Sequence, residues 1–140
     1  MTRKDRDWED SEVQWRALFG EDLSVSPKTL EKYLAHLNEH LTLPCEATGI
    51  EDFPWEEKYV FGYGDKKEYE RLKRDRLSYA DKFLIEKLVH DESYDGILAK
   101  VLRGKQEFDV PLDLIKATDQ DSTNCVLLDD YAVWFVNCGD

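Results

Sequence analysis

Apolar side chains in the first part of the chain recur at helical spacing. Residues 8–19 are predicted to form an amphipathic helix, because aromatic and aliphatic side chains return to one face before Gly20. The stretch SPKTLEKYLAHLNEHL predicts a second helix, with Ser26 as the N-cap and Pro27 as the first helical residue. Five apolar side chains share one face of this second helix: Leu30, Tyr33, Leu34, Leu37 and Leu41.

Strand-like patterns occupy much of the remaining chain. The stretch LPCEATGI leads into a first strand. The segments FLIEKLV, DGILAKVLR and EFDVPLDLI are rich in β-branched and other apolar residues and are separated by turn-like sequences, SYDG and RGKQ. They predict a small antiparallel sheet. Pro111 has no N–H to donate to a neighbouring strand, so the third segment is expected at an edge of the sheet or at a bend.

Two other segments have less regular patterns. Residues 51–82 are aromatic and charged; a helix is expected to start at Asp65, where Glu68 would complete a pair like a capping box. The C-terminal stretch CVLLDDYAVWFVN fits either one helix or two strands around an Asp-Asp turn, because its residue types also suit strands. The spacing of Leu127, Tyr131 and Trp134 favours the helix.

These patterns predict an α+β fold. N-terminal helices would pack on a small, mainly antiparallel β-sheet or partial barrel, and a helix would form the C-terminus. A chain of 140 residues suits one domain with its own core, helical over about 8–41 and β-rich over about 42–140.

The charge of the chain restricts its partners. A formal charge of −12 repels nucleic acid and anionic membrane surfaces and favours a cation or a basic protein partner. The three cysteines lack C-x-x-C spacing, which argues against a disulfide framework or a zinc ribbon. The first ten residues, MTRKDRDWED, lack the apolar core of a secretory signal, and no apolar run approaches a membrane span of about 20 residues. The cytoplasm is therefore the expected location.

Few motifs indicate an enzyme. His36, Glu39 and His40 spell H-x-x-E-H, the helical pattern of inverted zinc proteases, but a catalytic zinc needs a third protein ligand. The stretch FGYGD is expected to be a turn, because no G-K-[ST] follows its glycines. No G-x-S-x-G is present and no local signature surrounds a cysteine, so no catalytic activity is expected.

Carboxylates gather before and within the predicted C-terminal helix. Counted from Asp119 as position one of a twelve-residue calcium loop, Asp121 falls at position three, Thr123 at five and Asp130 at twelve. This arrangement requires the backbone to curl around one point. In the alternative, one straight helix separates Asp121 from Asp130 by about 13 Å along its axis, and Asp121 or Ser122 only caps it.

The C-terminal stretch VPLDLIKATDQDSTNCVLLDDYAVWF resembles the end of the small acidic calcium-binding proteins typified by CcbP. A V-P-L strand, an acidic D-x-D turn, an apolar helix with an Asp-aromatic pair and a tryptophan carry the resemblance, and HLTLPCEATG is similar to a strand of that family. The resemblance covers residues 107–136 and, less closely, 41–47. This chain departs from the family at Cys45, where the family has Phe, at Tyr131, where it has Trp, and across residues 51–82.

The resemblance implies a compact α+β protein that buffers or signals calcium without catalysis. The predicted ligands are Asp119, Asp121 and Asp130, with Thr123 as a weaker oxygen donor, Asp129 as an alternate ligand, and Glu46 closing the site from the preceding strand. We expect an affinity of about 10⁻⁵ to 10⁻³ M, because a short Asp stands where calcium loops have a bidentate Glu. The alternative is an acidic protein–protein interaction module that docks a basic partner without a metal.

Overall fold

A computed structural model describes residues 8–91 and 94–139. Its elements follow one another as α1 (Trp8–Phe19), α2 (Pro27–His40), β1 (Cys45–Gly49), the 3-10 turn η2 (Pro54–Glu56), α3 (Glu57–Val60), α4 (Lys66–Asp75), β2 (Phe83–His90), β3 (Ile97–Arg103), β4 (Gln106–Pro111), the 3-10 turn η3 (Leu112–Leu114), β5 (Ile115–Ala117) and α5 (Thr123–Cys138). The predicted α+β class is confirmed, and the sheet is open rather than a barrel.

The five strands form one antiparallel sheet in the order β4-β3-β2-β1-β5. Strand β4, which ends at Pro111, lies at an edge, as the missing N–H predicts. Strand β5 was not predicted as a separate element; η3 separates it from β4, and it pairs with β1 instead. A register shift between Ile85 and Lys87 keeps Leu88 on the buried face of β2 despite the odd spacing.

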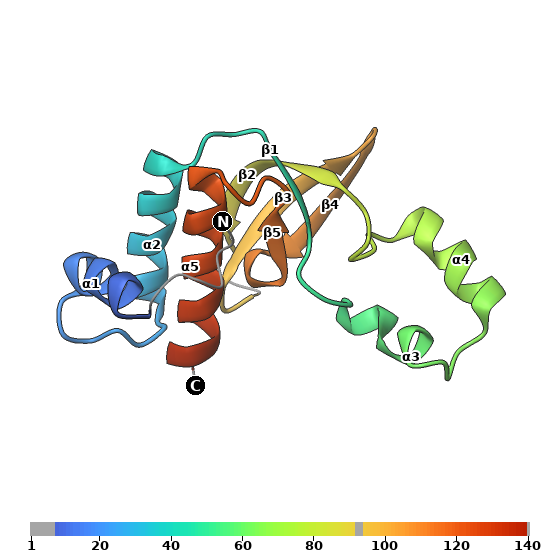
Figure 1. Cartoon of the computed structure of the whole chain (residues 1–140), viewed down its shortest axis with the longest axis horizontal. Coiled ribbons are helices and arrows are strands. Elements are labelled where there is room, and N and C mark those ends of the chain that lie inside the picture. Colours follow the sequence, from blue (N-terminus) through green and yellow to red (C-terminus); the bar gives the residue numbers. More distant parts are fainter. Residues whose placement is uncertain (1–7, 92–93, 140) are drawn as a thin grey trace.

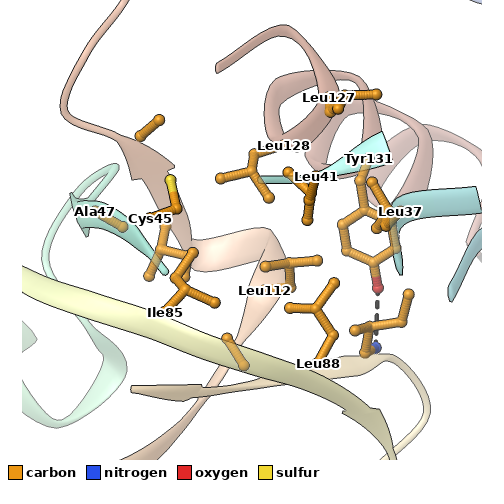
Figure 2. Close-up of a cluster of buried hydrophobic side chains, with 14 of the residues drawn as sticks. Leu37, Leu41, Cys45, Ala47, Ile85, Leu88, Leu112, Leu127, Leu128 and Tyr131 are labelled. Atoms are coloured by element: carbon orange, nitrogen blue, oxygen red, sulfur yellow. Dashed lines mark hydrogen bonds between the residues drawn. The ribbon is translucent and has the colours of Figure 1, made fainter. Parts of the chain in front are cut away.

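The core lies between the sheet and helices α2 and α5. Figure 1 shows the two long helices side by side along the sheet, with α1 beyond them. In Figure 2, Leu37 of α2, Leu41 at its C-cap and Leu128 of α5 lie with Ile85 and Leu88 of β2 in one buried cluster. Burying such side chains contributes about 1.5–3 kcal/mol each relative to exposure.

Local capping explains where the long helices begin. The Ser26 side chain accepts a hydrogen bond from the Thr29 amide, and the Ser26 amide donates to the Thr29 hydroxyl, so α2 begins with a capping box. Ser122 caps α5 by accepting from the Cys125 amide at 3.1 Å. The C-terminal segment is therefore a helix, and the alternative with two strands is wrong.

Residues 50–82 form the end of the molecule opposite α1, where Figure 1 places α3 and α4. Helix α4 begins after Asp65, as expected, and the Asp65 side chain accepts from the Lys67 amide. The predicted pairing with Glu68 is not formed, because the Glu68 carboxylate accepts from the Tyr59 hydroxyl. FGYGD is a turn, with Gly62 at a φ of 87° that favours glycine.

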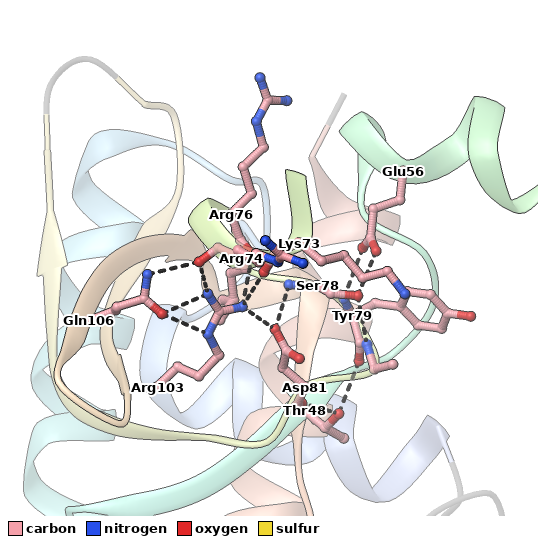
Figure 3. A network of polar contacts seen from close by, with 12 residues as sticks. Thr48, Glu56, Lys73, Arg74, Arg76, Ser78, Tyr79, Asp81, Arg103 and Gln106 are labelled. Atoms are coloured by element: carbon pink, nitrogen blue, oxygen red, sulfur yellow. Dashed lines mark hydrogen bonds and ion pairs between the residues drawn. The ribbon is translucent and has the colours of Figure 1, made fainter. Parts of the chain in front are cut away.

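Two ionic side chains, Glu56 and Arg103, connect separate segments at this end of the molecule. Glu56 is fully buried. The guanidinium of Arg103 on β3 donates to carbonyls at the last turn of α4, including those of Lys73 and Arg76, and to Asp81 at 2.6 Å. Figure 3 shows Arg103 between Gln106 and Asp81, beneath the end of α4. Arg103 therefore links α4 to the sheet.

Within the described residues, none of the helices has both the length and the apolar character that crossing a bilayer requires.

Candidate functional site

Pairing of β1 with β5 positions Glu46 near the predicted acidic turn. Ala47 lies opposite Ala117, and the Thr118 amide donates to the Glu46 carbonyl at 3.1 Å. The Thr118 hydroxyl also donates to Oε1 of Glu46 at 2.7 Å. The Glu46 carboxylate therefore lies beside the residue that precedes Asp119, although the two acidic residues are far apart in the sequence.

The turn between β5 and α5 holds Asp119 and Asp121, which are both exposed. Oδ1 of Asp119 accepts from the Asp121 amide at 3.1 Å, an Asx-type turn, and the Asp119 carbonyl accepts from the Ser122 hydroxyl at 2.7 Å. Ser122 then caps α5. The local sequence D-x-D-S thus forms a turn that leads directly into α5, and it leaves the carboxylates of Asp119 and Asp121 exposed to solvent.

Cys45 lies close to both sides of this acidic region. Burial raises the pKa of the Cys45 thiol, the Asn124 side chain opposes that shift, and the negative charges of Asp119 and Glu46 add to it. Asn124 itself bonds the Thr42 backbone at both its amide and its carbonyl, which holds the start of α5 beside the entrance to β1.

The other predicted ligands lie on α5. Thr123 is its exposed first residue. Asp129 and Asp130 are buried, at 1% and 4% exposure. Asp129 accepts from the Cys125 thiol at 3.2 Å, and Asp130 accepts from the Ser11 hydroxyl of α1 at 2.9 Å. The first contact lies within α5, and the second ties α5 to α1.

The twelve-residue loop is not formed, because residues from Thr123 onward are helical. Asp130 lies seven residues into α5, about 10 Å along the helix axis from its start. The prediction that the backbone curls around one point is therefore wrong, and the alternative of one straight helix describes this segment. The structure places Glu46 beside Thr118, the neighbour of Asp119, whereas Asp130 lies further along α5 and accepts from Ser11.

The donors around the acidic turn suit a hard cation. Calcium binds six to eight oxygens from carboxylates, carbonyls and water, and Glu46, Asp119, Asp121 and the Thr118 hydroxyl are all oxygen donors. Over residues 8–91 and 94–139, no group of three or more His, Cys, Asp or Glu side chains is already arranged to hold a metal ion. Asp119 and Asp121 are both exposed, so solvent and ions have access to their carboxylates.

A second candidate site is a groove that includes Trp55 and residues 75–77, within the aromatic block that the interaction-module hypothesis uses. A cavity of about 420 Å³ lies between η2, the end of α4 and the edge strand β4. Its lining is mainly apolar, with Trp55, Leu77 and Phe108 among the side chains, and it is bordered by three charged residues, Asp75, Arg76 and Asp109. Its walls come from three segments that are separate in the sequence, so its shape was not predicted.

The fold is similar to one solved structure. The chain superposes on the crystal structure of Anabaena CcbP with a TM-score of 0.60, over 97% of this chain and 95% of that chain. The chain has a CcbP-like fold. Sequence identity is 13%, so the likeness to Anabaena CcbP shows the fold alone. No protein-family model and no curated protein matches this chain.

Proposed function

We propose that this chain is a non-catalytic calcium-binding protein whose ion lies at the turn between β5 and α5. The observation that carries the proposal is the pairing of Thr118 with Glu46, which brings a third carboxylate to the Asp119–Asp121 turn. The CcbP-like fold supports it, since the C-terminal sequence resembles that calcium-binding family.

The proposal assigns different roles to the predicted ligands. Asp119, Asp121 and Glu46 bind the ion directly, and water completes its coordination. Thr123 offers a hydroxyl at the helix start. Asp129 and Asp130 keep their buried contacts and support α5 from within. The ion reduces repulsion between the exposed carboxylates and therefore stabilises the folded state.

Calorimetric titration of calcium tests this assignment. In Asp119→Asn/Asp121→Asn, the turn keeps its Oδ1 acceptor while two charges are lost, so the fold is preserved. The matched control, Glu31→Gln/Glu107→Gln, removes two exposed charges elsewhere. We expect the wild type to bind calcium at about 10⁻⁵ to 10⁻³ M, with the turn variant at least about tenfold weaker and the control unchanged.

Thermal melting gives an independent measurement. The melting temperature of the wild type should rise with calcium and rise less with magnesium, because magnesium demands stricter octahedral geometry and sheds water reluctantly. A flat calcium isotherm for the wild type, or equal calcium affinities for the wild type and the turn variant, would refute calcium binding at this turn.

The groove supports a second candidate function, an acidic interaction module. Its apolar lining fits an extended peptide with an apolar side chain, and Asp75, which borders the groove beside Arg76, is the carboxylate for an adjacent lysine or arginine. Asp109 already pairs with Lys100 at 3.1 Å. Such peptides should shift the amide NMR signals of Trp55 and Phe108, with affinity that falls with salt and does not change with a calcium chelator. No shift with a panel of these peptides would exclude this candidate.

A further inference from the structure

Two histidines form a pair on one face of α2. His36 and His40 are one helical turn apart, and their ring centroids lie 4.5 Å from each other. The His36 ring meets the buried Tyr33 ring edge-on, with 6.1 Å between centroids, which restricts its orientation. His36 is half-buried and His40 exposed, so an ion can reach the pair from solvent.

Gln14 of α1 supplies a third donor group to this pair. Its side-chain amide nitrogen lies 3.0 Å from Nε2 of His36. The nitrogen and oxygen of a glutamine amide exchange places when the group turns by half a rotation, so Oε1 can occupy the same position. Two ligands that each lie about 2.0–2.1 Å from a tetrahedral zinc are about 3.3 Å apart, close to the separation of these two atoms.

The electrostatic surroundings favour a cation at these rings. Burial lowers the pKa of His36, the neighbouring His40 lowers it further, and Glu39 and Asp130 oppose the shift. Helix α2 ends at His40, where the unpaired carbonyls carry partial negative charge. The chain as a whole has a formal charge of −12.

We propose that His36 and His40, with Gln14 as an additional ligand, form a binding site for a borderline divalent transition-metal ion of the zinc and nickel class. Imidazole suits these ions, whereas calcium requires oxygen ligands, so this site is chemically distinct from the acidic turn. Nothing in the proposal depends on calcium binding. The three side chains come from α1 and α2, and a bound ion would cross-link these helices.

Zinc calorimetry on tag-free protein tests the proposal. Calcium is present in excess throughout, so that oxygen sites do not contribute to the zinc signal. All variants carry Cys138→Ser, because Cys138 is the half-buried thiol among Cys45, Cys125 and Cys138. His36→Ala and His40→Ala should each weaken zinc binding at least about tenfold, and Gln14→Ala by a smaller factor.

The third histidine is the matched control. His90 lies on β2, and His90→Ala should bind zinc within about twofold of the parent. Because the chain has 3 histidines, two of the three histidine ring signals should shift in NMR spectra as zinc is added. Circular dichroism verifies that each variant is folded. Zinc affinity that is unchanged in His40→Ala, or that is lost in His90→Ala, would overturn the proposal; unchanged affinity in Gln14→Ala would remove Gln14 from the site.

Discussion

Replacement of Glu56 tests whether one buried carboxylate organises residues 50–82. Oε1 of Glu56 accepts from the Phe53 and Tyr79 amides at 3.3 and 2.8 Å. Oε2 accepts from the Tyr69 and Ser78 hydroxyls at 2.7 and 2.6 Å. All of these donors converge on a side chain that is 0% exposed, so its removal leaves them without their acceptor.

Two substitutions at Glu56 should differ in cost. Glu56→Ala leaves two backbone N–H groups without an acceptor, at about 1–3 kcal/mol each, so we expect a loss of about 2–6 kcal/mol in the free energy of unfolding. Glu56→Gln keeps one oxygen for the backbone donors, and its NH₂ can donate to the Tyr69 and Ser78 hydroxyls once these rotate. We expect that change to cost about 1–2 kcal/mol, the difference between charged and neutral hydrogen bonds.

Urea denaturation followed by circular dichroism measures these losses, and hydrogen exchange of α4 amides shows whether this end opens first. Glu57→Ala is the matched control, because Glu57 is the next residue and is exposed. Its effect should stay within about 0.5 kcal/mol. If Glu56→Ala is no more destabilising than Glu57→Ala, the carboxylate does not organise this end of the molecule.

Two further predictions concern the sheet and its surroundings. Arg103→Ala should lower the free energy of unfolding by about 2–4 kcal/mol in urea denaturation, because the helix-end carbonyls of α4 and the Asp81 carboxylate lose their donor. Lys100→Ala is the control, because it removes only a half-exposed ion pair on the same strand and should cost under about 1 kcal/mol. Equal losses in the two variants would contradict the role of Arg103. Burial raises the pKa of Asp113 in the folded state, so folding favours the protonated carboxyl. The stability that this preference contributes is complete below the unfolded pKa of the group and is lost as pH rises through its folded pKa. Asp113→Asn, which can still accept from the Tyr94 hydroxyl, should therefore raise the urea midpoint at pH 7 and leave it unchanged near pH 3, and the same effect at both pH values would refute the reasoning.

Local patterns predicted most of the helices and strands because their causes are local. The apolar face of α2, its Ser26–Pro27 start and the proline at the end of β4 all act within a few residues. Strand β5 was missed because it has three residues, too few for a recognisable alternation, and its partner β1 lies far away in the sequence.

The candidate site was harder to predict, because its geometry depends on distant partners. Nothing near Asp130 in the sequence indicates that Ser11 of α1 binds it in the interior. Spacing alone did not distinguish an exposed carboxylate at Asp119 from a buried one at Asp130. The ligand role of Glu46 stays a prediction; the antiparallel pairing of β1 with β5 places its side chain beside Thr118, the residue before Asp119.

The open sheet leaves two strand edges that could recruit the backbone of another molecule. Strand β4 presents Glu107 and Asp109 as exposed charges and ends at Pro111, whose ring removes a donor. The opposite edge, β5, spans three residues, too short to template an added strand. Charge, proline and short length thus protect both edges of the open sheet against edge-to-edge pairing, although the strands do not close into a barrel.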